Sequence, residues 1–132
     1  MPNNQSGNPG FRYRRLWLTM GWALVAVIIY LSLTPHPIEI QVEEGDKMGH
    51  LLAYGTLMLW FAQLYGSTQA RWVLAAGCVA LGVGLEFAQT LTDTRAFELA
   101  DMAADAAGVG IGWLLAPPRL FNFLYRVEAV LP

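Results

Sequence analysis

The sequence predicts an all-α polytopic membrane protein with four transmembrane helices and a short C-terminal interfacial helix. The 132-residue chain is 55% hydrophobic and only 14% charged, whereas a soluble domain carries about 25% charged residues. Its mean hydropathy is +0.40, and four apolar runs follow one another along the chain. A single cysteine, Cys78, excludes an internal disulfide. The net charge of −2 gives no reason to expect nucleic-acid binding.

The first apolar run, Leu16–Thr34, follows a polar segment at 1–15 that we interpret as a flexible tail. Without a charge, this run gives about 28 Å of helix, enough to cross hydrocarbon, and Pro35 ends it. A cleaved signal peptide is the alternative, because arginines precede the run. The run exceeds the roughly 7–15 residues of a signal h-region, and no A-x-A-like site follows, which favours a retained helix.

Three further runs, Met48–Ala70, Trp72–Thr92 and Leu99–Ala116, complete a predicted four-helix domain over 16–116. Taken alone, the last two could be buried helices of a soluble protein. We interpret them as spans because no soluble domain is present to cover them. Short connections predict antiparallel neighbours.

The segment 117–132 places apolar residues at helical spacing, which predicts an amphipathic helix lying in the membrane interface. These residues are Leu120, Phe123, Leu124, Val127 and Leu131.

Basic residues predict the orientation. With four spans, one face receives six arginines, and the other receives only Lys47 and Arg95. The positive-inside rule then places both termini in the cytoplasm and the protein in the cytoplasmic (inner) membrane. The six arginines are Arg12, Arg14, Arg15, Arg71, Arg119 and Arg126.

The second helix begins with a polar stripe. Asp46, His50 and Tyr54 are spaced four residues apart and share one helical face, with Lys47 beside them. In the structural interpretation Asp46 caps the helix, Lys47 snorkels and His50 bonds a neighbouring helix.

The third helix carries Glu86 and Gln89, one turn apart. Glu86 lies roughly 9 Å below the expected helix boundary, where a lipid-facing carboxylate costs several kcal/mol. We therefore expect it to point into the bundle, either as a functional group or in a buried structural pair.

The fourth helix begins with Asp101 and Asp105, again on one stripe, and Arg95 is the natural counter-charge. Gly108-x-x-x-Gly112 further along is a small-residue packing face, which could also serve a homo-oligomer.

The polar residues of three helices converge on one predicted outward-facing cleft. We assign Glu86, His50 and Asp101 as catalytic candidates, with Glu86 and His50 as the acid/base pair. No metal is assigned, and the cofactor stays unknown. The substrate-binding candidates are Asp46, Lys47, Tyr54, Gln89, Arg95 and Asp105.

In order and spacing, these positions resemble the VanZ-like family of membrane proteins. The matching pattern is Asp46-Lys47-x-x-His50-x-x-x-Tyr54, Glu86-x-x-Gln89, Arg95 and Asp101-x-x-x-Asp105-x-x-Gly108-x-x-x-Gly112. The resemblance implies a role in the cell envelope, and the family is named for a protein linked to lowered sensitivity to the glycopeptide teicoplanin. The family usually has Asn where this chain has Asp105. Asp105 is therefore either protonated or offset by His50, Arg95 or a cation.

Three functions remain open. The first is an enzyme that uses activated water on a membrane lipid or a lipid-linked envelope precursor. The second is a non-catalytic binder or scaffold that uses the same cleft. The third is an ion- or proton-coupled transporter or a metal site built from Glu86, Asp101, Asp105 and His50.

Overall fold

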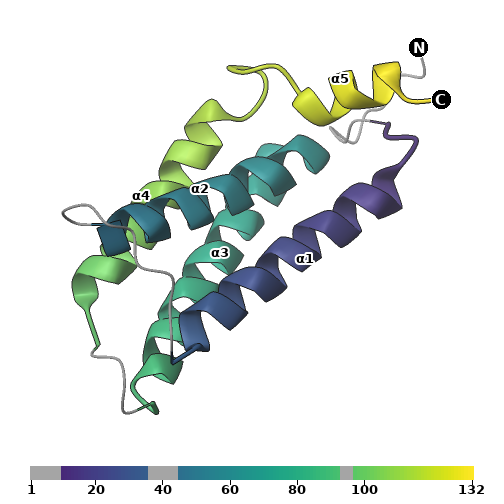
Figure 1. The fold of residues 1–132 in the computed structure, drawn as a ribbon. Helices are drawn as coiled ribbons and strands as arrows, with labels where there is room; N and C mark the ends of the chain where they lie inside the picture. Colours follow the sequence, from purple (N-terminus) through teal and green to yellow (C-terminus); the bar gives the residue numbers. More distant parts are fainter. Residues whose placement is uncertain (1–9, 36–44, 93–96) are drawn as a thin grey trace.

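The computed structural model describes residues 10–35, 45–92 and 97–132, and the regular structure there consists of five helices. The predicted all-α class is therefore confirmed (Figure 1). The helices are α1 (Arg14–Leu33), α2 (Gly45–Leu64), α3 (Thr68–Gln89), α4 (Leu99–Leu115) and α5 (Phe123–Val130).

The predicted four-span topology is wrong. Among the described helices, α1 and α3 are long and apolar enough to cross a membrane, and α2 and α4 are not. Three polar residues, Asp46, Lys47 and His50, occupy the first two turns of α2. The 17 residues of α4 include two aspartates and reach only about 25 Å, less than the hydrocarbon thickness of about 30 Å. Parts of the apolar runs of α2 and α4, such as Leu57, Met58 and Val109, pack within the molecule, while Leu99 and Leu114 of α4 are exposed.

The two candidate spans are not core helices. Only 17% of the apolar stretch of α1 and 28% of that of α3 is buried. Large side chains such as Trp22, Tyr30 and Val73 are more than 60% exposed. Exposed apolar surface of this extent is typical of a site that contacts a membrane or another protein.

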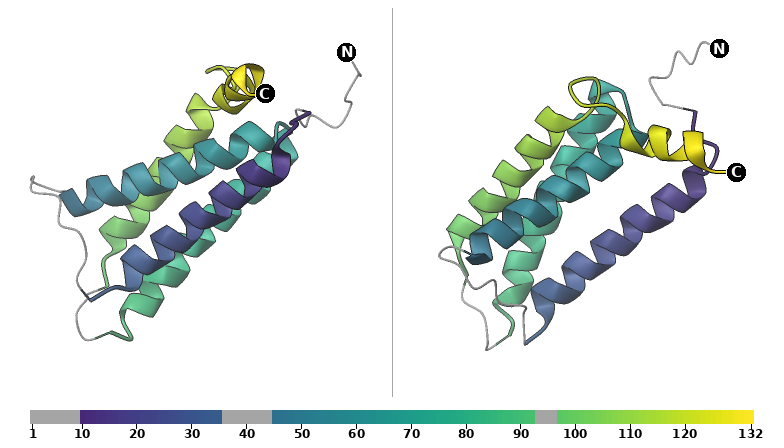
Figure 2. Two further views of the ribbon diagram at one scale, coloured as in Figure 1. Left: turned by 45° about the vertical axis from the view of Figure 1, so that its right-hand side comes forward. Right: turned by 45° about the horizontal axis from the view of Figure 1, so that its top comes forward.

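The helices form a bundle in which α1 and α3 run parallel to each other, and α2 and α4 run the opposite way (Figures 1 and 2). At one end Gln89 of α3 bonds Ser32 of α1, and at the other Trp72 of α3 packs on Trp113 of α4. We call the end where α1 and α3 begin the arginine end, because all six predicted inner arginines lie in segments at this end.

Glycines bring α2 and α4 into close contact. A Cβ on Gly108 would lie 3.0 Å from the backbone nitrogen of Gly55, and one on Gly112 would lie 3.1 Å from that of Leu59. The predicted small-residue face is confirmed as a packing face. Because α2 of the same chain covers it, we do not retain this face as a contact between copies.

Helix α5 closes the arginine end. Leu124 is 1% exposed and packs with Trp17 and Leu64. The Asn122 side chain caps the helix by accepting from the Tyr125 N–H. Of the apolar stripe predicted to lie in the membrane interface, Leu124 is buried against the bundle, whereas Val127 is 39% exposed.

Candidate functional site

The polar stripes of α2 and α4 meet at His50. Its Nδ1 lies 2.7 Å from Asp105 Oδ1, and its Nε2 lies 3.6 Å from Asp101 Oδ2. The four-residue spacing of the two aspartates places both on the face of α4 that meets α2. The imidazole is 15% exposed, and the aspartate side chains are 6% and 3% exposed. The convergence of these three residues predicted from the sequence is thus observed. We call Asp46, His50, Asp101 and Asp105 the His50 cluster.

Asp105 contacts the Nδ1 atom of the His50 imidazole. A carboxylate can only accept, so His50 Nδ1–H donates to Asp105. This hydrogen bond raises the pKa of His50, whereas burial lowers it. Asp105 therefore has His50 as its hydrogen-bond partner.

Asp101 is less well satisfied. It is 4% exposed, and its Oδ1 has no hydrogen-bond partner among the described residues. Burial raises the pKa of Asp101 from 3.8 to about 6, although the nearby His50 lowers it. A buried carboxylate oxygen without a donor is costly, and a proton or a cation would satisfy it.

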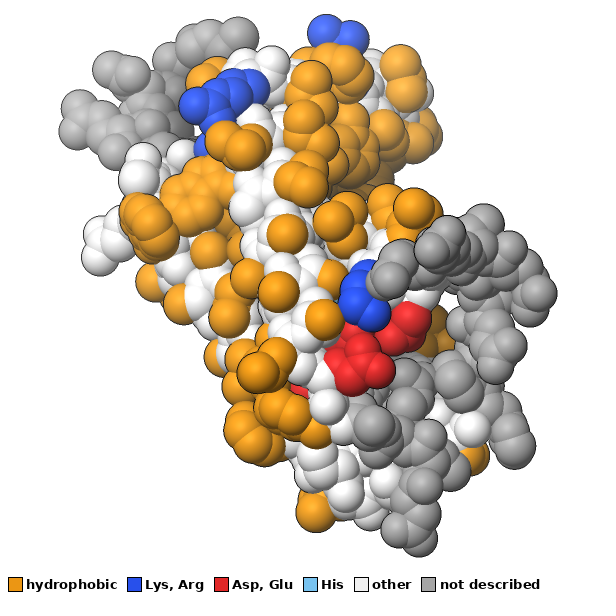
Figure 3. Space-filling view, turned by 90° about the vertical axis from the view of Figure 1, so that its left-hand side faces the viewer, with side chains coloured by type: hydrophobic (Ala, Val, Ile, Leu, Met, Phe, Trp, Pro, Cys, Tyr) orange, Lys and Arg blue, Asp and Glu red, His pale blue; other side chains and the backbone are white. Residues whose placement is uncertain are grey.

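The rim of the cluster comes from the first turn of α2. Asp46 is exposed there, and because α2 begins at Gly45 it lies within the helix rather than at the predicted N-cap. Lys47 Nζ lies 3.6 Å from Glu98 Oε2, with both side chains more than one-third exposed. Figure 3 shows the acidic side chains gathered on this face beside a basic one, with hydrophobic side chains over much of the remaining surface.

Two predicted site residues of α3 connect helices instead. Glu86 is 1% exposed, and its Oε1 accepts a hydrogen bond from the backbone N–H of Glu98, at the start of α4, over 2.8 Å. Gln89 Nε2 donates to the carbonyl oxygen of Ser32 over 2.8 Å. The structure pairs His50 with Asp105 and Glu86 with the start of α4, and the acid/base roles of Glu86 and His50 stay a prediction.

Tyr54, a further predicted site residue, does not line an open cleft. Tyr54 is 3% exposed and belongs to the hydrophobic core with Leu57 and Val109. Arg95, the predicted counter-charge, lies outside the described residues.

The sequence gives no direct sign of the polar network at the arginine end. Arg71 is 8% exposed, and its guanidinium donates to the carbonyl oxygens of Ala62, Tyr65 and Pro117. From the sequence, Arg71 contributes only to the predicted membrane orientation, as one of the six arginines. The available signal was its place just after a helix end, where unpaired carbonyl groups need donors.

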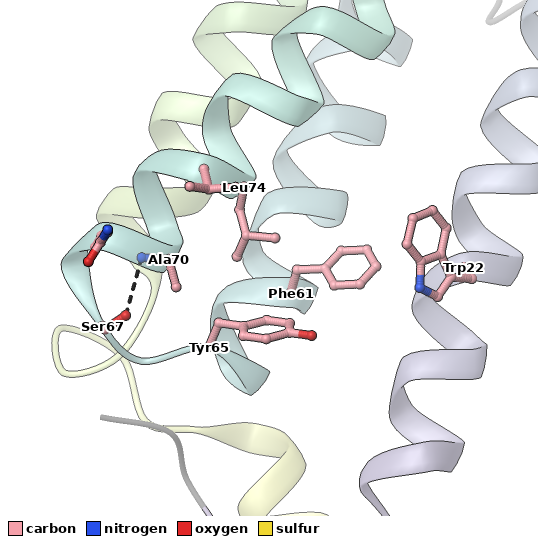
Figure 4. A pocket seen from close by; sticks show the side chains of 8 residues that line it. Trp22, Phe61, Tyr65, Ser67, Ala70 and Leu74 are labelled. Atoms are coloured by element: carbon pink, nitrogen blue, oxygen red, sulfur yellow. Dashed lines mark hydrogen bonds between the residues drawn. The ribbon is translucent and has the colours of Figure 1, made fainter. Parts of the chain in front are cut away.

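A separate cavity of about 530 Å³ lies near the arginine end between α1, α2 and α3 (Figure 4). Trp22 of α1 faces Phe61 of α2 and Tyr65, just after α2, across it. The rest of the lining comes from Ser67, Gln69, Ala70, Val73 and Leu74. This lining is largely apolar and contains no ionisable site residue predicted from the sequence. The candidate functional site is therefore the His50 cluster, outside this cavity.

No family model, curated protein or solved structure matches this chain. What the chain does must therefore be inferred from its own side chains.

Proposed function

We propose that this protein resides in a membrane through α1 and α3 and that it acts on the polar head group of an amphiphilic envelope molecule at the His50 cluster. The exposed apolar faces of α1 and α3 support the location. The positive-inside rule favours a cytoplasmic arginine end, which leaves the His50 cluster near the opposite membrane surface. A head group lies at that depth, whereas acyl chains do not.

The observation that carries the proposal is the 2.7 Å contact between His50 Nδ1 and Asp105 Oδ1. Asp105 orients the imidazole. The His50 side chain is 15% exposed, more than the side chains of Asp101 and Asp105 that it contacts. His50 Nε2 then acts as general base and takes a proton from a water molecule, whose oxygen bonds to the carbonyl carbon or phosphorus of the head group. The bond to the ester oxygen breaks, and the leaving alcohol takes the proton from His50. Lys47 at the rim attracts an anionic head group.

The VanZ-like resemblance supports an envelope molecule as the substrate class. The positions that carry it include the members of the His50 cluster, and the resemblance extends the proposal to a lipid-linked envelope precursor and to teicoplanin tolerance. Asp105 differs from the Asn usual in that family. In this chain the difference places a carboxylate on His50, which strengthens the base.

The test uses the purified full chain in lipid nanodiscs with a lipid-linked envelope precursor, and mass spectrometry follows both bound precursor and product. We expect turnover by the wild type, and a loss of at least about 100-fold in His50→Gln with retained binding, because general-base catalysis contributes about 10²–10⁴-fold. Glu98→Gln is the matched charge control, because this exposed acid lies at the same end and contacts Lys47 rather than His50. It should keep turnover and change only the affinity for the head group.

Two outcomes would contradict hydrolysis. Precursor that binds the wild type and is never changed would show a non-catalytic binder. Equal turnover by His50→Gln and the wild type would remove His50 from the reaction.

A further inference from the structure

Three potential metal ligands lie together in the His50 cluster. Asp46, His50 and Asp101 each offer one ligand atom, and these atoms all lie within 4.8 Å of one another. Asp46 and His50 are four residues apart on α2, so they share one helical face. Asp101 comes from α4, which the glycine contacts hold close to α2. Two packed helices therefore supply the ligand set.

The Asp101 carboxylate gives an independent indication of a ligand. Its side chain is almost completely buried beside His50, and Oδ1 has no hydrogen-bond partner within the part of the chain that the structure describes. Buried polar atoms are nearly always partnered. A cation bound at this position would supply the missing partner and offset the negative charge.

The orientation of His50 matches that of a metal-binding histidine. Histidines that bind metals usually donate their other ring N–H to a carboxylate, which fixes the tautomer. Here Asp105 receives the Nδ1 proton, and Nε2 faces Asp101 Oδ2 at 3.6 Å. With bonds of about 2.1 Å, two ligand atoms of a tetrahedral zinc ion lie about 3.4 Å apart, so His50 and Asp101 are already near binding distance.

We propose that Asp46, His50 and Asp101 bind a divalent transition-metal ion of the zinc class, with Asp105 positioning His50. One imidazole nitrogen and two carboxylate oxygens suit such an ion, and three protein ligands leave a fourth position for water. The exposed Asp46 side chain supplies the third ligand of the set. The inference rests on the site of the proposed function and changes one role in it. Nε2 of His50 would bind the ion and could not also accept a proton, so a metal-bound water, a stronger nucleophile at neutral pH, would replace the water that the histidine base activates.

Zinc binding can be measured without any substrate. The full chain in detergent micelles is treated with EDTA, freed of chelator and titrated with Zn²⁺ by calorimetry, and elemental analysis gives the stoichiometry. We expect one ion per chain and at least a 10-fold weaker affinity in His50→Gln and Asp101→Asn. Asp105→Asn should bind about 10–100-fold more weakly through its effect on His50. Glu98→Gln should bind like the wild type.

Asp46→Asn provides a ligand variant that should fold like the wild type, because the Asp46 side chain is exposed. It should also weaken zinc binding at least 10-fold, with an unchanged circular-dichroism spectrum. Absence of zinc binding by the wild type, or affinities of Asp46→Asn, His50→Gln and Asp101→Asn equal to the wild type, would overturn the metal site.

The two experiments can contradict the metal site and the proposed hydrolysis independently of each other. Specific zinc binding without turnover of the precursor supports the site and contradicts hydrolysis. Turnover that persists with no zinc binding supports the histidine base and overturns the metal site.

Discussion

At the residue scale, one imidazole organises the polar chemistry of the acidic face. His50 satisfies Asp105 through Nδ1, while Asp101 keeps an unpartnered oxygen beside Nε2. Asp105 therefore serves to orient His50, whereas Asp101 still has a carboxylate oxygen that needs a partner.

Gly82 of α3 makes room for this arrangement. A Cβ there would lie 2.5 Å from Asp105 Oδ2, so Gly82→Ala must displace the carboxylate from His50. We expect a loss of about 1–3 kcal/mol in the free energy of unfolding, measured by denaturation in mixed micelles. Gly84→Ala is the matched control, because nothing lies within 4 Å of its Cβ, and we expect a change of at most about 1 kcal/mol. Equal destabilisation by both variants would show that Asp105 is not held against Gly82.

At the element scale, α2 and α4 pack together, whereas α1 and α3 present apolar surface outward. His50 of α2 and Asp101 and Asp105 of α4 are covered where the two helices meet, whereas Asp46 stays exposed. Backbone approach at Gly55, Gly108 and Gly112 makes this contact close.

The α2–α4 contact predicts a difference between two glycines of α4. In Gly112→Ala the new methyl group would meet Met58 Cβ at 3.0 Å and the backbone of α2, and backbone cannot move aside as a side chain can. We expect a loss of about 1–3 kcal/mol in unfolding free energy. Gly110→Ala, whose Cβ meets nothing within 4 Å, should be nearly neutral. A stable Gly112→Ala protein with unchanged unfolding would argue against this close contact.

At the scale of the whole molecule, opposite ends have opposite character. The arginine end is closed by a polar network that joins the first and last segments, and the other end carries the His50 cluster. Glu128 of α5 accepts hydrogen bonds from the backbone N–H groups of Arg12 and Tyr13 and from Trp17 Nε1. This carboxylate therefore ties the two ends of the chain together.

Glu128 predicts a pH dependence of stability. Burial raises its pKa, but the hydrogen bonds from Tyr13, Trp17 and Arg12 outweigh this and lower the pKa below 4.5. A lowered folded-state pKa stabilises the protein above the unfolded value, and this stabilisation is lost as the pH falls through the folded value. Glu128→Gln should therefore unfold more easily at pH 7, by about 1–2 kcal/mol.

The difference between the wild type and Glu128→Gln should shrink as the pH falls from about 5. Thermal unfolding in micelles at several pH values measures it, and comparing the difference removes the titration of other acids. A difference that stays constant down to pH 3 would contradict a stabilising Glu128 carboxylate.

The sequence by itself determined the features that depend on local patterns. Helix positions followed from apolar runs, and the stripes of His50 and of Asp101 with Asp105 followed from four-residue spacing. The small-residue face of Gly108 and Gly112 followed in the same way. Each depends only on residues within a few turns of one helix.

Only the tertiary structure decided which helices are covered and which polar groups pair. Apolar content alone cannot distinguish α2 and α4, which pack on each other, from a lipid-facing span. Glu86 holds the start of α4, and Arg71 holds the end of α2, through contacts between segments distant in sequence. The physical reason is that a hydrogen bond requires partners within about 3 Å, and the packing of the helices sets those distances.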